Sequence, residues 1–399
     1  MSGGAARVAE VFREEAGRVT AALVRRFGDF NLAEDCVQDA LVAALETWPR
    51  DGVPERPAAW LTTVATRRAL NRLDRDRRHR EKLALVAAAP ADGEHDDRLR
   101  LILACCHPAL SRDAQVGLTL RAVAGFTNAE IARAFVVPEA TIAQRLVRAK
   151  RKIAGAGIPY RIPSEVELEG RLTVVLDVLY LVFNEGHLAT RGEESAHRDL
   201  AEEAAWLAAL VLRLLPNEPE PMGLLALMKL HLARGPTRFD AGGRMVLLGD
   251  QERARWDRAL IDQAIGLVER AARQARPGPY QLEAAIAACH AEAPSLDRTD
   301  WPQIVVLYDM LLALAPSPVV RCNRAIAAWR VHGPELALRD LDALAGELDG
   351  YHLFHAARGE ILQDLGRREQ ARAAQLRAFD LTRNPAERAL LQRRVFAEE

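Results

Sequence analysis

The sequence lacks the features that mark membrane, secreted and zinc-binding proteins. No apolar run approaches the about 20 residues of a membrane-spanning helix, and no signal-peptide pattern opens the chain. The five cysteines include no Cys-x-x-Cys pair, which argues against a zinc knuckle or a disulfide framework. Strand signals are nearly absent, VVRC and RMVLL being the best. We therefore expect a cytoplasmic, all-α protein with no membrane association and no metal or other cofactor.

Two groups of residues invite a metal or catalytic interpretation, and we favour neither. Cys105-Cys106-His107 is a cluster of possible ligands, but small buried thiols are ordinary core residues. A metal-hydrolase site is also conceivable, but Glu-x-His is not the zincin motif, and His-x-x-x-His is missing. We therefore predict no catalytic residue and no enzyme. The residues considered for such a site are Asp177, Glu185, His187 and His197.

The net charge of −1 hides a division along the chain. Residues 1–160 hold 25 Lys and Arg against 20 Asp and Glu, or +5, and the remainder holds 29 against 35, or −6. A basic region is the electrostatic footprint of nucleic-acid binding. A chain of 399 residues is long enough for two to four domains. We expect DNA contacts in the first part and none in the second.

The stretch from Thr127 to Ile153 is typical of a helix-turn-helix. Thr127 and Glu130 form a Thr-x-x-Glu capping box, and Pro138 favours the start of a second helix. On that second helix one face is predicted to be buried, consisting of Ile142, Leu146, Ala149 and Ile153. Another face carries groups that suit a DNA major groove, namely Thr141, Gln144, Arg145 and Arg148, with Lys150 and Arg151 following. The alternative is an amphipathic helix pair with a solvated charged face.

Two helices of opposite character are predicted upstream. The segment from Pro57 has an apolar line of Leu61, Ala65, Ala69 and Leu73, and the rest is crowded with arginines that suit phosphate contact. The segment from Ala33 to Trp48 has a core stripe of Val37, Leu41, Ala44, Leu45 and Trp48. Its predicted outer face is acidic and consists of Glu34, Asp35, Gln38 and Asp39. That face is either soluble surface or a docking surface for a basic protein.

These three segments together resemble a bacterial sigma factor of the extracytoplasmic-function type. AEDCVQDALVAAL, PAAWLTTVATRRALNRL and TNAEIARAFVVPEATIAQRLVRAKRKI match that family's helices in order, over roughly the first 155 residues. More than half of the chain follows these segments. It therefore resembles the subgroup with a C-terminal tetratricopeptide-like helical extension.

The resemblance implies core RNA polymerase and promoter DNA as partners. It implies that the acidic face Glu34, Asp35, Gln38 and Asp39 docks on the polymerase and that the second helix of the helix-turn-helix reads the −35 element. It also implies that the loop from Pro49 to Arg56 captures a flipped base at the −10 element and that the following helix holds the melted strand. The implied residues are Arg50, Arg56, Trp60, Arg67, Arg68, Asn71, Arg72 and Arg75.

Breaks in the pattern predict the domain boundaries. We expect a first domain over 5–82, a linker over 83–98, a helix-turn-helix domain over 99–154, a helical extension over 165–295 and repeats over 296–395. In the last part Ala337 and Ala371 each follow shortly after a glycine, and their separation matches the tetratricopeptide period of about 34 residues. Such repeats stack into a groove for a peptide or protein ligand. The alternative is a helical bundle with accidental spacing.

The extension is expected to regulate the first two domains, so no dedicated anti-sigma factor is expected. The Asp240–Arg244 loop resembles an acidic, glycine-containing motif of the extended subgroup, and its role stays open. Two other functions remain as alternatives, a dimeric helix-turn-helix regulator with a repeat sensor and a scaffold built on the repeats. An acidic docking helix beside an arginine-rich helix argues against the first, and two basic elements argue against the second.

Overall fold

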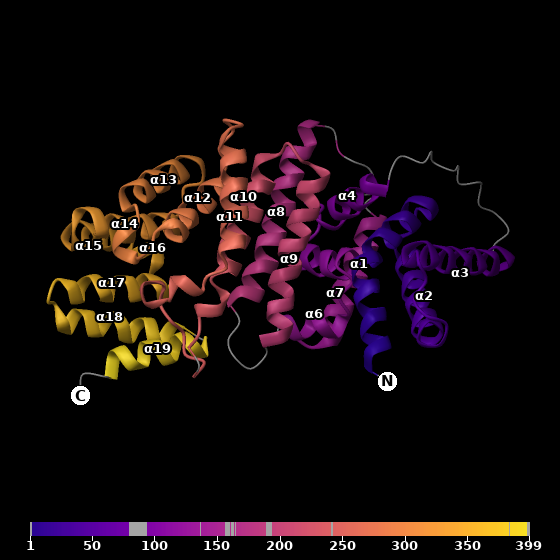
Figure 1. Ribbon diagram of the computed structural model, residues 1–399, viewed down its shortest axis with the longest axis horizontal. Helices are drawn as coiled ribbons and strands as arrows, with labels where there is room; N and C mark the ends of the chain where they lie inside the picture. The colour runs from indigo at the N-terminus through magenta and orange to yellow at the C-terminus, as the bar shows by residue number, and fades with distance from the viewer. Residues whose placement is uncertain are drawn as a thin grey trace. The chain divides into compact units, whose positions relative to one another are not determined.

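The structure is a computed structural model that describes residues 2–79, 94–135, 137–155, 160, 163, 165–188, 194–240, 242–382 and 384–396. Within these ranges the regular structure is helical, and the one β interaction is an isolated antiparallel bridge between Phe239 and Met245 (Figure 1). The all-α prediction is confirmed. Of the weak strand candidates, VVRC lies inside helix α14 (Pro318–His332), and RMVLL supplies the bridge.

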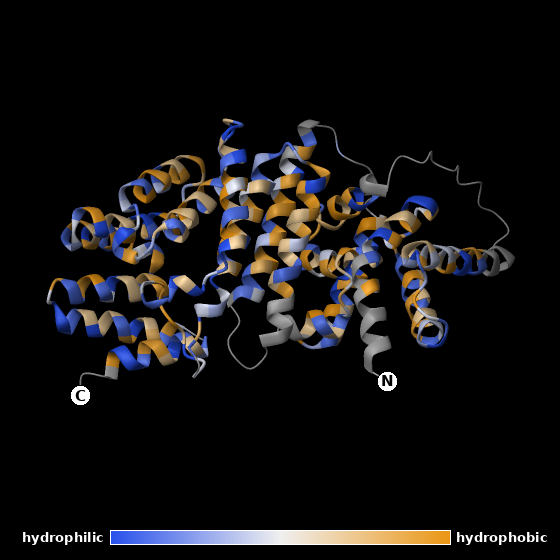
Figure 2. Ribbon diagram, in the orientation of Figure 1, coloured by the Kyte–Doolittle hydropathy of each residue, from blue (hydrophilic) through white to orange (hydrophobic). Residues whose placement is uncertain are grey.

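The chain divides into two compact units. Unit 1 comprises residues 1–187 and 195–214, and unit 2 comprises residues 188–194 and 215–399. In both units hydrophobic and hydrophilic residues are interspersed along the helices (Figure 2). Helix α7 (Glu139–Gly155) has one buried face, whereas α10 (Pro219–Ala233) is buried at consecutive positions from Pro221 to Met228.

Unit 1 begins with three helices, α1 (Ser2–Phe27), α2 (Phe30–Asp51) and α3 (Pro57–His79). Asp29 caps α2, since its side chain accepts a hydrogen bond from the Leu32 N–H at 3.0 Å. Gly52, at φ 86°, ends the helix in a conformation that favours glycine and donates to the Trp48 carbonyl. The predicted apolar line of α3 is buried at Leu61, Ala65 and Ala69, whereas Leu73 is exposed.

The helix-turn-helix part of unit 1 contains α4 (Glu94–Cys105), α5 (Arg112–Leu118), a π-helical turn (Thr119–Val123), α6 (Asn128–Ala134) and α7 (Glu139–Gly155). Helix α4 begins at Glu94, so the linker predicted over 83–98 was wrong for its last five residues. Acidic residues favour a helix start, and Asp97 is tied down by ion pairs to Arg25 at 2.9 Å and Arg100 at 3.0 Å. Residues 80–93 of that linker lie outside the described residues.

Two long helices complete unit 1, α8 (Glu165–Leu188) and α9 (Glu194–Leu214). Ion pairing and ring contacts connect them to the helix-turn-helix part. Arg112 lies 2.9 Å from Asp177 of α8, and the Arg98 guanidinium lies 5.8 Å from the centre of the Trp206 ring of α9. The compact unit therefore includes α8 and α9, although the sequence predicted a domain boundary between residues 154 and 165.

Unit 2 contains α10 (Pro219–Ala233), α11 (Arg258–Ala272) and α12 (Pro279–Glu292). The segment between α10 and α11 is irregular and includes three short 3₁₀ turns, Gly235–Thr237, Leu248–Asp250 and Arg253–Arg255. Helices α10 and α12 approach closely at Gly223, where a Cβ would lie 2.5 Å from the Gln281 nitrogen. Glycine is needed there because any side chain would push the two helices apart.

The C-terminal helices of unit 2 repeat with the tetratricopeptide period of about 34 residues. They are α13 (Trp301–Leu314), α14 (Pro318–His332), α15 (Pro334–Asp342), α16 (Ala345–Leu348), α17 (His352–Asp364), α18 (Arg368–Leu381) and α19 (Pro385–Phe396). Helix α17 begins one such period after α14, and α18 begins one such period after α15. The two alanines that carried the repeat prediction, Ala337 and Ala371, are buried in one apolar cluster with Leu341, Phe354 and Ile361. The spacing is therefore structural rather than accidental.

Candidate nucleic-acid interface

The predicted capping box forms and begins the first helix of the helix-turn-helix. The Glu130 N–H donates to Thr127 Oγ1 at 3.2 Å, and the Thr127 N–H donates to Glu130 Oε2 at 2.7 Å. Helix α7 then starts directly after Pro138. The reciprocal pair explains why the chain turns into a helix at this point.

Helix α7 presents one buried and one exposed face, as its sequence pattern predicts. Ile142, Leu146 and Ala149 are each 3% exposed, and Ile153 is half-buried. The residues predicted to read DNA at −35 mostly lie away from that stripe. Gln144, Arg148 and Arg151 are exposed, and Thr141 and Arg145 are partly exposed. Helix α7 is thus anchored by its apolar face, which leaves a row of polar side chains accessible.

Arg145 has a partner within unit 1. Its Nη1 lies 3.2 Å from Asp113 Oδ2, and the two side chains are 39% and 65% exposed. Ion pairs in such exposed positions contribute about 0–1 kcal/mol. Arg145 can therefore exchange Asp113 for another acceptor at little cost.

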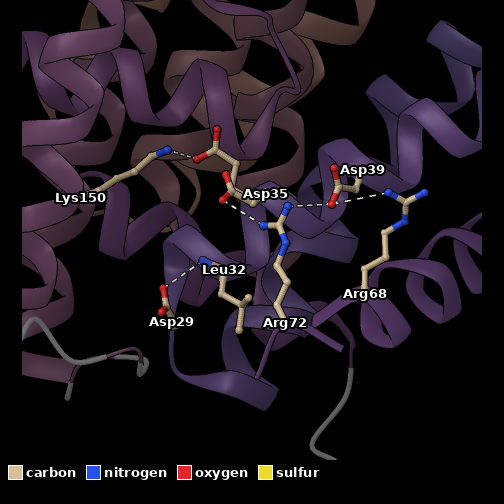
Figure 3. A network of polar contacts seen from close by, with 8 residues as sticks. Asp29, Leu32, Asp35, Asp39, Arg68, Arg72 and Lys150 are labelled. Atoms are coloured by element: carbon tan, nitrogen blue, oxygen red, sulfur yellow. Dashed lines mark hydrogen bonds and ion pairs between the residues drawn. The ribbon is translucent and has the colours of Figure 1, made fainter. Parts of the chain in front are cut away.

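Lys150 does not belong to the exposed row. It lies nine residues after Thr141, or about two and a half helical turns, so it lies on the opposite side of the helix. Its ammonium group forms an ion pair with Glu34 of α2, and its side chain is 14% exposed (Figure 3). It also lies 6.0 Å from the centre of the Phe30 ring. The prediction that Lys150 shares the DNA-reading face was wrong because the helical period places it against α2.

Glu34 is correspondingly buried, and the prediction that it lies on the outer face of α2 was wrong. The residue is 6% exposed, and Arg121 donates from Nε to its Oε1 at 2.8 Å. Arg121 also donates from Nη1 to the Phe126 carbonyl at 2.9 Å. A buried carboxylate needs such partners to offset the loss of water. Sequence reasoning missed Arg121, because its partner is 87 residues away and no local pattern marks the pair.

Asp35 and Asp39 do lie on the accessible side of α2, where they meet arginines of α3. Arg72 lies 3.1 Å from Asp35 and 2.8 Å from Asp39, and Arg68 lies 3.6 Å from Asp39 (Figure 3). Gln38 is half-buried. The spacing of four residues on each helix aligns two carboxylates with two guanidinium groups. Residues predicted to bind polymerase are thus paired with residues predicted to bind the melted strand.

The remaining predicted −10 residues differ in accessibility. Arg50, Arg56, Arg67 and Asn71 are exposed. Trp60 is half-buried and packs edge-on against the buried Trp48, with ring centres 5.3 Å apart. Arg75 lies in α3, but its side chain lies outside the described residues. Part of the Trp60 ring therefore packs in the core against Trp48, and the rest is accessible.

A half-buried tyrosine ties the segment after α7 to helices α1 and α4. The Tyr160 hydroxyl donates to one of two carbonyls within reach, that of Ala21 at 3.1 Å or that of Asp97 at 2.9 Å. Burial, together with the nearby Asp97, raises the pKa of this phenol above its usual range. Helices α1 and α4 are therefore held by the chain that leaves the helix-turn-helix.

The cysteine pair behaves as core. Cys105 and Cys106 are buried, and Cys106 Sγ lies 3.4 Å from Thr119 Oγ1. Burial raises the pKa of Cys105 well above its usual value and that of Cys106 to about 12. A thiol in this state is a poor ligand and a poor nucleophile. In the parts of the chain that the structure describes, no group of three potential ligands is placed to hold a metal ion.

The Asp240–Arg244 loop is a tight turn closed by its first and last residues. Asp240 accepts from the Arg244 N–H at 2.9 Å and from Arg244 Nε at 2.6 Å, and Gly243 supplies φ 76°. The backbone hydrogen bond and then the Arg244 side chain lower the pKa of Asp240. The geometry of the turn therefore explains why Asp240, Gly243 and Arg244 occupy these positions.

Comparisons with known proteins follow the same division of the chain. The model for Sigma-70 region 2 matches residues 11–79, and that for Sigma-70, region 4 matches residues 100–153. A family of unknown function (DUF6596) matches residues 171–272. A protein of Rhizobium meliloti (strain 1021), described as uncharacterized, is 44% identical over 384 residues, which cover 93% of this chain and 91% of that protein. No solved structure matches.

Among the helices described, none combines the length and apolar character that crossing a membrane requires. The two sigma-70 regions occur in order, each on the helices that the geometry above assigns to it, and an extension follows them. The chain therefore belongs to the sigma-70 family of RNA polymerase sigma factors, as a member of the extracytoplasmic-function type with a C-terminal extension.

Proposed function

We propose that this sigma factor docks on core RNA polymerase through α2 and reads its promoter through α7, α3 and the loop between α2 and α3. Binding of polymerase and promoter DNA follows from the family. Within this proposal, Gln144, Arg145 and Arg148 contact the −35 element. Arg50, Arg56 and Arg67 contact the −10 region, and Asp35 and Asp39 bind the polymerase.

The accessibility of α7 is the observation that carries this assignment. Its apolar side chains are buried while Gln144, Arg148 and Arg151 are exposed on one helix of a capped helix-turn-helix. An exposed row of amide and guanidinium donors on the second helix is the arrangement that reads base edges and phosphates in a major groove. Arg67 and Asn71 supply the same chemistry on α3.

The ion pairs of Glu34 indicate that a conformational change accompanies binding. Glu34 and its partner Lys150 lie in the two segments that polymerase and promoter would engage, and together with Arg121 they hold α2 against the helix-turn-helix. We infer that the two parts separate when both are engaged at once. The extension would regulate this step within the same chain, without a dedicated anti-sigma factor.

A run-off transcription assay tests the proposal. Purified core polymerase is combined with the full-length chain and a library of promoter fragments, and transcripts are sequenced. Defined start sites downstream of a shared pair of elements are expected only when both proteins are present. The proposal fails if the chain instead binds symmetric duplex operators as a dimer and adds no start site to the core enzyme.

A further inference from the structure

A half-open groove of about 710 Å³ lies within unit 2 and has no role in the proposed promoter recognition. One wall is the segment after α10, and the other is formed by α17, α18 and α19 (Figure 1). Met245, Val246 and Leu247 line the first wall, and Leu390 and Val395 line the second. Alternate side chains of an extended chain share a face, so Met245 and Leu247 form an apolar strip along this wall.

The helical wall is rich in arginine. Arg368, Arg372, Arg393 and Arg394 line it, with Glu360 as its one carboxylate. Glu360 forms an ion pair with Arg394, with Nη1 and Oε1 2.6 Å apart. Within the described residues neither Arg368 nor Arg393 forms an ion pair, and both are exposed. Arg393 donates from Nε to the Ala389 carbonyl at 3.4 Å. The Nη groups of both arginines can therefore donate charge-assisted hydrogen bonds to a ligand in the groove.

The extended wall offers main-chain donors. The Val246 N–H donates to the Arg238 carbonyl at 2.8 Å, across the bridge that pairs Phe239 with Met245. Because main-chain groups alternate along an extended strand, the N–H groups of Met245 and Leu247 lie on the opposite edge. Within the described ranges neither N–H forms a backbone hydrogen bond. An unpaired edge of this kind can accept another extended chain.

We propose that this groove binds a short, extended, acidic peptide segment of a partner protein. Its backbone would pair with the edge at Met245 and Leu247, its apolar side chains would cover the strip, and its carboxylates would meet Arg368 and Arg393. Charge complementarity sets the orientation. Asp240 is neutralised by Arg244, whereas Asp250 is exposed and forms no ion pair among the described residues. Asp250 would repel carboxylates, so the acidic residues of the peptide face the helical wall.

A peptide-selection experiment tests the charge requirement. A phage-displayed library of random decapeptides is panned on the full-length chain and, in parallel, on the Arg368→Glu/Arg393→Glu variant. Sequences enriched in Asp and Glu should be retained about tenfold or more better by the wild type, the factor expected for losing a hydrogen bond to a charged group. Arg339→Glu is the matched control, since Arg339 is an exposed arginine of the same unit outside the groove. No acidic enrichment, or equal retention by the wild type and the double variant, would overturn the proposal.

A second comparison tests backbone pairing with one selected peptide, labelled and followed by fluorescence anisotropy. Leu247 has φ −67°, which proline adopts without strain, so Leu247→Pro deletes only the unpaired N–H and part of the side chain. Leu247→Ala trims the side chain and keeps the N–H. The proline variant should bind about three- to tenfold more weakly than the alanine variant, at unchanged melting temperature. Equal affinities of the two variants would rule out pairing along this edge, and with it the extended peptide.

Discussion

Arg148 and Lys150 are two residues apart on α7, and their surroundings differ. Arg148 is exposed, whereas Lys150 is held by the buried Glu34. Both are basic side chains beside the same apolar stripe. The helical period separates them, and the contact with α2 decides which of the two is accessible.

The first prediction concerns the accessible arginines of α7. If Arg145 reads a base, Arg145→Ala should cost about 1–3 kcal/mol of promoter binding and relax specificity at one position. If Arg148 holds phosphate, Arg148→Ala should weaken all promoters alike and reduce the salt slope by about one. Fluorescence titrations of the polymerase complex across a salt series measure both, with Arg339→Ala as control. Unchanged binding by the double variant would refute the assignment.

The second prediction concerns Glu34. Glu34→Ala leaves Arg121 and Lys150 facing each other in a buried place, so the contact between α2 and the helix-turn-helix should lose about 3–5 kcal/mol. Hydrogen exchange of α7 amides should accelerate accordingly. Asp35→Ala is the matched control, because that exposed pair should contribute about 1 kcal/mol or less. Similar exchange in the two variants would show that the buried pair does not hold the parts together.

At the scale of elements, local signals were enough for the helices and not for the contacts between them. The capping box of α6, the apolar face of α7 and the spacing of the repeats are each encoded within a few turns, and each was predicted. The buried position of Glu34 was not, because its neighbours Asp35 and Gln38 look equivalent in sequence. Only the approach of Arg121 from a distant element makes one carboxylate differ from the next.

The third prediction treats the acidic face of α2 as a docking element. Asp35→Asn with Asp39→Asn should weaken retention of core polymerase in a pull-down while circular dichroism stays unchanged. Asparagine is the better replacement, because lysine would repel Arg68 and Arg72 and disturb the packing of α2 on α3. Asp262→Asn, at an exposed position of α11, serves as control. Full retention of polymerase by the double variant would exclude this docking surface.

The fourth prediction concerns the junction of α12 with the irregular segment of unit 2. Burial, then the nearby Arg234 and Arg253, lower the pKa of His290 to about 4. Its buried Nδ1 has no hydrogen-bond partner among the residues that the structure describes. A histidine with a lowered folded pKa stays neutral in the native state while the unfolded chain takes up the proton. Stability should therefore fall as pH drops from about 6.5 towards 4, by about 2 kcal/mol down to pH 5.

Denaturant unfolding at pH 7 and pH 5 measures this loss. His290→Gln should remove most of the difference between the two pH values, whichever way it changes stability at pH 7. His332→Gln is the comparison, because that histidine is exposed at the end of α14. The same pH dependence in wild type and His290→Gln would assign it to other groups.

At the scale of the whole molecule, the charge division of the chain motivates the last prediction. Residues 1–160 carry +5 and the candidate DNA contacts, and the remainder carries −6. Most of this acidic excess, −5, lies in residues 161–214, which contain α8 and α9 of unit 1, and residues 215–399 carry −1. Parts of one chain have a mutual effective concentration on the order of millimolar, so even weak contacts between acidic and basic parts would be occupied. We therefore expect the extension to change transcription several-fold.

Three chains separate the contributions: residues 1–163, residues 1–214 and the full length. Both fragments should bind promoter DNA with core polymerase. The longer one should melt at the higher temperature, because it keeps α8 and α9 with the Arg112–Asp177 ion pair and the contact of Arg98 with Trp206. A fall in transcript yield on truncation would make the extension an activating arm, and a rise would make it an inhibitor within the chain. Identical yields from all three at matched concentrations, across a salt series, would show that residues beyond 163 have no role in initiation, and the extension would then serve another partner.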